Sequence, residues 1–170
     1  MEYNLQEHAK LIIEPLAEED LDWVTELEKE SFSLPWSREA FEEEIGHPDR
    51  LFVVAKLRTE QGQMLGVGYA GMFLSFDEGE ITNVAVNPRF RGKGIGYRML
   101  TSQMEMAGQK DVKSFTLEVR VSNAGAIHLY EKLGFEKEGF LIQDLVYNGR
   151  NVNRYVYGKI RRDDIDDINS

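Results

Sequence analysis

A short basic, glycine-rich segment of the chain has the composition of an anion-binding loop. Its residues are Arg91, Gly92, Lys93, Gly94, Ile95 and Gly96. Glycines let the backbone adopt positive φ and approach a ligand closely. Apolar residues recur at helical spacing after it and predict a helix over about 95–109. The free N–H groups of that helix's first turn would point at an anion, above all a phosphate, and the two cations would add to the attraction.

The spacing of these glycines differs from that of two common phosphate-binding loops. The dinucleotide pattern G-x-G-x-x-G belongs to the first β-α unit of a chain, whereas Gly92, Gly94 and Gly96 alternate in mid-chain. The P-loop requires Ser or Thr after Gly-Lys, and here Gly94 follows Lys93. The segment therefore predicts a phosphate ligand of another class.

Composition and charge exclude several classes of function. The chain has 170 residues and a net charge of −10, which disfavours binding to a nucleic-acid backbone. It has no cysteine, so disulfides, thiolate-bound metals and a cysteine nucleophile are excluded. Its three histidines show no metal-ligand spacing, and we expect no metal.

The chain shows neither a membrane-spanning run nor a signal peptide. No apolar stretch approaches the roughly 20 residues needed to cross a bilayer, and the N-terminus lacks a basic region with an apolar core. We expect a cytoplasmic protein with no membrane partner. One domain is predicted over 1–162, followed by a flexible acidic tail over 163–170 that contains four Asp.

Hydrophobic periodicity predicts an α/β chain with a mixed sheet. The expected strands are 11–14, 51–56, 64–74, 80–86, 114–121, 135–146 and 151–160, and the expected helices are 18–31, 37–45, 95–109 and 123–133. Asn148-Gly149 predicts a hairpin. The first two helices carry many acidic residues, which predict a solvated face or a surface that attracts a basic partner. These residues are Glu26, Glu28, Glu30, Glu39, Glu42, Glu43 and Glu44.

Several motifs, in order along the chain, resemble the GNAT superfamily of acyl-coenzyme A N-acyltransferases. Arg91-x-x-Gly94-x-Gly96 matches its pyrophosphate loop, 81–88 its fourth strand and 117–123 its fifth. Residues 123–135 resemble its following helix and closing turn. Ser33-Leu-Pro-Trp36-Ser37 resembles a narrower group, and the closest likeness is to ribosomal-protein-alanine N-acetyltransferases of the RimI type. The resemblance covers about 12–139.

This resemblance implies a fold and a cosubstrate site. The fold would be a mixed central sheet of about seven strands with about four helices, splayed open between strands 4 and 5. Acetyl-coenzyme A would lie in that opening. The backbone of Val84, Ala85 and Val86 would pair with the pantetheine, amides from Arg91 to Gly96 would hold the pyrophosphate, and Asn123 would bind the far arm.

The resemblance also implies direct acetyl transfer to an amine. Glu118 would be the general base, acting through water, and Tyr130 the general acid for the leaving thiolate. An alternative for Glu118 is a surface ion pair with Arg120 or another cation. An alternative for Tyr130 is a partly buried aromatic side chain that packs against the sheet.

The acceptor is the least determined part of the prediction. A protein N-terminus is favoured, with a ribosomal-protein alanine first, because an α-amine loses its proton about 2.5 pKa units more easily than lysine. Pro35, Trp36 and Tyr147 are the candidate acceptor-binding residues, although Trp36 would also suit a structural anchor. Beyond Gly139 the resemblance loosens. A polyamine, another small amine or a protein lysine stays open, as do a non-catalytic coenzyme A sensor and either a monomer or a homodimer.

Overall fold

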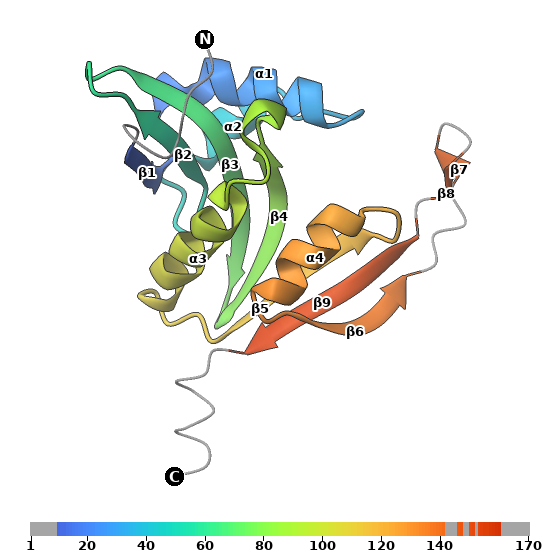
Figure 1. The fold of residues 1–170 in the computed structure, drawn as a ribbon. Helices are drawn as coiled ribbons and strands as arrows, with labels where there is room; N and C mark the ends of the chain where they lie inside the picture. The colour runs from blue at the N-terminus through green and yellow to red at the C-terminus, as the bar shows by residue number, and fades with distance from the viewer. Residues whose placement is uncertain (1–9, 142–145, 148–149, 152, 161–170) are drawn as a thin grey trace.

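The structure, a computed structural model, describes residues 10–141, 146–147, 150–151 and 153–160 (Figure 1). Its elements are β1 (Lys10–Pro15), α1 (Leu21–Ser31), α2 (Arg38–Glu44), β2 (Val53–Arg58), β3 (Met64–Ser75), β4 (Glu78–Val86), α3 (Ile95–Gly108), β5 (Ser114–Arg120), α4 (Ala124–Lys132), β6 (Glu136–Leu141), β7 (Val146–Tyr147), β8 (Arg150–Asn151) and β9 (Arg154–Ile160). Short 3₁₀ turns precede α1 and α3.

Seven strands form one mixed sheet in the order β1-β2-β3-β4-β5-β9-β6. Every neighbouring pair is antiparallel except β4 and β5, which are parallel and connected through α3. The predicted fold is confirmed. The predicted strand 135–146 is wrong in extent, because β6 ends at Leu141 and a separate pair, β7–β8, follows. The residues of the predicted turn, 148–149, and the predicted tail, 163–170, lie outside the described residues.

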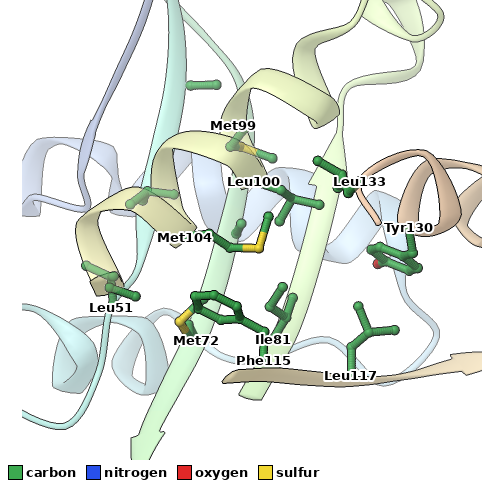
Figure 2. Close-up of a cluster of buried hydrophobic side chains, with 14 of the residues drawn as sticks. Leu51, Met72, Ile81, Met99, Leu100, Met104, Phe115, Leu117, Tyr130 and Leu133 are labelled. Carbon is green, nitrogen blue, oxygen red and sulfur yellow. The ribbon is translucent and has the colours of Figure 1, made fainter. Parts of the chain in front are cut away.

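A hydrophobic cluster covers each face of the sheet. On one face, α3 and α4 pack on strand residues such as Met72, Ile81 and Leu117, with Tyr130 of α4 beside them (Figure 2). On the other face, α1 and α2 pack through Leu21, Val24, Leu27 and Phe41 against β2, β3 and β4. The two layers therefore hold β4 from both sides, whereas β5 is covered on the α3–α4 side alone by these clusters.

Strands β4 and β5 separate halfway along their length. Their pairing begins at Glu78↔Ser114 and ends at Ile81↔Leu117. Just beyond, β4 uses three residue steps from Ile81 to Val84 where β3 uses two from Met72 to Ala70, which is a β-bulge. A bulge bends a strand and increases its twist, so it turns β4 away from β5. Meanwhile β5 stays paired with β9 as far as Arg120↔Arg154.

Candidate active site

The separated part of β4 has backbone groups directed at the opening between the strands. The amide of Asn87 donates to the carbonyl of Val67 on the β3 side. Because backbone groups alternate between the two edges of a strand, Ala85 pairs with β3 while Val84 and Val86 direct theirs at the opening. Of the three residues predicted to pair with pantetheine, two therefore face the opening with their backbone.

The side chains of these residues pack on the sheet faces. Val84 and Val86 lie against the cluster under α3 and α4, and Ala85 lies in the cluster under α1 and α2. The apolar side chains thus pack in the core, while the backbone groups of Val84 and the amide of Val86 face the opening.

The predicted anion loop lies between the end of β4 and the start of α3. Gly92 and Gly94 have φ of 74° and 79°, in the left-handed region that favours glycine. The first helical bond of α3 runs from the Arg98 amide to the Gly94 carbonyl, so the amides of the preceding turn have no helical partner. Gly96 lies close to Leu129 of α4, and a Cβ there would approach its side chain to 3.2 Å. These features fit a bound pyrophosphate.

The two cations of the loop differ in their contacts. Arg91 donates from Nε to the Val86 carbonyl at 3.2 Å, so its side chain joins the loop to the end of β4. Lys93 is exposed and remains available to a phosphate oxygen. The Arg91 amide also makes a long contact to the Pro88 carbonyl. The loop therefore offers the amides after Gly92 more freely than that of Arg91.

Asn123 is the N-cap of α4. Its side-chain oxygen accepts the amide of Ala126 at 3.1 Å, which satisfies one of the free donors of the helix. A contact from its side chain to the cosubstrate, as predicted, would have to use the remaining amide group.

Tyr130 projects from α4 toward the point where β4 and β5 separate (Figure 2). It is 7% exposed and contacts Phe135 edge-on, with ring centroids 6.1 Å apart. Burial raises the pKa of its phenol to about 12, and desolvation is the only cause. The hydroxyl therefore stays protonated through the physiological range and remains a donor.

Glu118 lies on the opposite face of β5. Its neighbours Leu117 and Val119 are buried under α4, so the alternation of the strand directs Glu118 to the other side. Its carboxylate pairs with Arg154 Nη1 of β9 at 3.3 Å, and the two side chains are 41% and 35% exposed. The predicted ion pair exists with Arg154 rather than Arg120, and the carboxylate is open to water.

The opening thus has a donor on one face and a carboxylate on the other. A thioester carbonyl held between the strands would present its two sides to different groups. A solvent-exposed carboxylate suits removal of a proton from an incoming amine, and a buried phenol suits a hydrogen bond to a departing sulfur. The arrangement supports acyl transfer without a covalent enzyme intermediate.

Trp36 anchors the loop between α1 and α2 on the sheet. Its ring lies 5.4 Å from Phe41, 5.7 Å from Phe52 and 6.4 Å from Phe73, centroid to centroid. Pro35 beside it is exposed. The Trp36 side chain therefore acts as the structural anchor that the sequence also allowed. The exposed surface of this loop is formed by the residues on either side of it.

A buried polar cluster on this side was not identified from the sequence. Glu28 of α1 is 2% exposed, so its assignment to a solvated acidic face is wrong. It accepts hydrogen bonds from the hydroxyl of Tyr69, from the Trp36 amide at 3.2 Å and from Asn83 Nδ2 at 3.5 Å. Burial raises the pKa of the Glu28 carboxyl, opposed by the bonds from Trp36 and Asn83. Its position four residues after Val24, on the apolar stripe, was the available signal.

Three further observations concern the remaining predictions. The backbone of Tyr147 lies in β7, which pairs with β8. Among the described residues, no group of three or more His, Cys, Asp or Glu is arranged to hold a metal ion. In the same part of the chain, no helix is long and apolar enough to cross a membrane.

Comparison with known proteins identifies the family. The model of the acetyltransferase (GNAT) family matches residues 21–135. This chain belongs to the GNAT family. It is 32% identical over 125 residues to the [ribosomal protein bS18]-alanine N-acetyltransferase of Escherichia coli strain K12, covering 74% of this chain and 80% of that protein.

Solved structures of GNAT proteins share the fold. The E. coli ribosomal-protein-S18-alanine N-acetyltransferase superposes with a TM-score of 0.74 at 27% identity, covering 88% of this chain and 92% of that one. Arabidopsis thaliana NAA60 in complex with acetyl-CoA has a TM-score of 0.76 at 17% identity and covers 89% of this GNAT chain and 98% of its own. The chain is an N-acetyltransferase of the GNAT type and is similar to proteins of the RimI group.

Proposed function

We propose that this enzyme transfers acetyl from acetyl-coenzyme A to the N-terminal α-amine of a protein, with a ribosomal-protein alanine as the favoured acceptor. The carrying observation is the opening between β4 and β5, with Glu118 on one face and Tyr130 on the other. The likeness to bS18-alanine N-acetyltransferases supports the choice of acceptor.

In this proposal, the cosubstrate binds mainly through backbone groups. Val84 and Val86 hold the pantetheine by their strand edge, as one strand pairs with another. The amides at the start of α3, with Lys93 beside them, hold the pyrophosphate. A backbone N–H of the bulged part of β4 supports the oxyanion that forms when the amine attacks.

The acceptor amine approaches from the α1–α2 face in this proposal. Glu118, through a water, takes the proton that the amine loses, and Arg154 holds the carboxylate in place. An α-amine has a pKa near 8 and lysine about 10.4, so the former needs about 3.4 kcal/mol less for deprotonation. This difference favours an N-terminal acceptor for a base of modest strength.

Tyr130 stabilises the departing thiolate from the other face. A thiol has an ordinary pKa of about 8.5, whereas burial raises the pKa of Tyr130 to about 12. Full transfer of the phenolic proton would therefore be uphill by roughly 3–4 pKa units. The role that follows is donation of a hydrogen bond to the sulfur as the carbon–sulfur bond breaks. Coenzyme A then leaves as a thiolate and takes its proton from solvent.

A mass-spectrometric acceptor panel tests the function. It contains acetyl-coenzyme A with peptides that begin with free Ala, Ser, Met or Gly, an N-blocked lysine peptide, and spermidine. We expect acetylation of N-terminal amines, with Ala preferred. Acetylation of spermidine or lysine alone would refute the proposed acceptor, and cosubstrate binding without any product would favour the sensor alternative.

A further inference from the structure

The Glu28 carboxylate connects the α1–α2 loop with the bulged part of β4. One of its oxygens, Oε1, accepts from the Trp36 amide at 3.2 Å and from Asn83 Nδ2 at 3.5 Å. Its other oxygen, Oε2, accepts from the hydroxyl of Tyr69 on β3. Three elements that are separate in sequence thus meet at one carboxylate.

This cluster is buried, and its centre requires a side chain that accepts hydrogen bonds. Glu28, Tyr69 and Asn83 are 2%, 1% and 7% exposed. All three groups that face the carboxylate are donors, and within the described chain no cation pairs with it. A buried carboxylate costs free energy unless its oxygens are bonded. An apolar residue of the same length would leave three buried donors unsatisfied.

The two residues at the ends of this connection, Asn83 and Trp36, lie near the proposed positions of the thioester and of the acceptor. Asn83 directly precedes Val84 and lies beyond the last pair between β4 and β5, where the thioester would lie. Trp36 belongs to the α1–α2 loop, in which Phe32 and Leu34 are 39% and 73% exposed. This loop is on the face from which the acceptor is proposed to approach. Aromatic residues hold the ring of Trp36. Its amide donates to Glu28, which also accepts from Asn83, and this pair of bonds links the loop backbone to β4.

We propose that Glu28 is a positioning residue for the acceptor. It holds the α1–α2 loop against β4, so that the nitrogen of a bound amine is directed at the carbonyl carbon of the thioester. The proposal rests on the function proposed above. Glu28 acts by its length and its accepting oxygens and takes no part in proton transfer. Misplacement of reacting groups by about 1 Å costs about 10²-fold in rate, so a small shift of the loop is enough.

Three variants test the proposal. Glu28→Met keeps the length and removes the acceptors. Glu28→Gln keeps the carbonyl that can accept from Trp36 and Asn83, and its amide can donate to the Tyr69 oxygen. Thr25→Val, one turn earlier on α1, removes a buried hydroxyl that bonds only within the helix, to the Leu21 carbonyl. It is the matched control for a loss of helix stability.

Two quantities are measured for each variant: kcat/KM for the acceptor and the dissociation constant of acetyl-coenzyme A. We expect Glu28→Met to lose about 10²-fold in kcat/KM for the acceptor and to keep its cosubstrate affinity. We expect Glu28→Gln to stay within about 10-fold of the wild type, since one reversed hydrogen bond is a small change. Thr25→Val retains wild-type kinetics.

Two kinetic outcomes would overturn the proposal. A Glu28→Gln enzyme as impaired as Glu28→Met would show that the negative charge itself is needed. If the Glu28→Met enzyme is no slower than Thr25→Val, Glu28 contributes to folding stability and has no role in positioning the acceptor. These kinetics use whichever amine the wild-type enzyme acetylates. If that amine is not a protein N-terminus, the proposed acceptor is refuted, and the Glu28 variants still test the positioning role with the amine that is used.

Hydrogen exchange at the Trp36 amide tests the connection without any acceptor. We expect protection in the wild type, in Thr25→Val and in Glu28→Gln, and fast exchange in folded Glu28→Met. Equal protection in the folded Glu28→Met protein would show that the loop is held by its aromatic ring alone and would overturn the proposal.

Discussion

The two sides of the opening are built in different ways. The proposed cosubstrate side comes mainly from one continuous segment, 84–96, and presents backbone groups and glycines. The proposed acceptor side combines side chains from α1, the α1–α2 loop, β4, β5 and β9, with Glu28 and Glu118 as two of its carboxylates. A site made of backbone groups keeps its affinity when side chains change and loses it when the backbone conformation changes. A site made of side chains loses its function when a single side chain is replaced.

Tyr130→Phe should give the largest effect, because it removes the only donor proposed for the leaving sulfur. A donor aimed at developing negative charge is worth about 10²–10³-fold in kcat, so we expect a loss at the upper end of that range, while the dissociation constant of acetyl-coenzyme A stays unchanged in a calorimetric titration. Tyr157→Phe is the control, since it removes a phenolic hydroxyl that bonds the Glu131 side chain on α4 and has no role in the proposed chemistry. Equal kcat in the two variants would remove Tyr130 from the chemistry.

Glu118→Gln tests the acceptor side. The variant keeps the size of the side chain but cannot take a proton, so kcat should fall by about 10²-fold with cosubstrate affinity retained. Glu138→Gln, an exposed carboxylate of β6 on the same sheet, should leave the steady-state kinetics intact. A Glu118→Gln enzyme of normal rate would leave the ion pair with Arg154 as the role of this residue.

Gly94→Ala tests the backbone character of the cosubstrate side. Alanine in the left-handed region is strained by about 1–2 kcal/mol, so the loop should shift and acetyl-coenzyme A should bind about 10-fold more weakly. Gly62→Ala is a close control, because Gly62 also has positive φ, 81° against 79°, and lies in the turn between β2 and β3. If both variants bind the cosubstrate equally well, the loop is not its binding site.

The smallest effect concerns the pH dependence of stability. The folded protein holds the pKa of Tyr130 at about 12 against an ordinary 10.0. The unfolded chain therefore loses this proton first, and the stability contributed by the neutral phenol is lost as pH rises from 10 to 12. Between pH 9 and 11, the wild type should lose about 1.4 kcal/mol more than Tyr130→Phe in urea unfolding. Parallel losses would place the phenol in contact with water.

The same contrast explains which parts of the site could be predicted from sequence. The glycine loop and the start of α3 were recognisable because alternating glycines before a helix are a local pattern. The family resemblance located Glu118 and Tyr130 within one strand and one helix. Glu28 was assigned to a solvated face because acidic residues on helices are usually exposed, although its spacing from Leu21 and Val24 placed it on the buried stripe.

Other features depended on partners that no local pattern contains. Arg154, not Arg120, pairs with Glu118, because β9 lies antiparallel beside β5 and brings its side chains onto the same face. Trp36 was compatible with two roles until the rings of Phe41, Phe52 and Phe73 were found around it. The direction of the Ala85 backbone required the register between β3 and β4.

The sequence by itself determined the family, the order of the elements and the glycine loop, because periodicity, turn residues and positive φ are properties of short segments. Only the tertiary structure decided where β4 and β5 separate, which residues share a face of the sheet and why a glutamate is buried in α1. Those features depend on strand register and on a β-bulge, and both are set by contacts between residues distant along the chain.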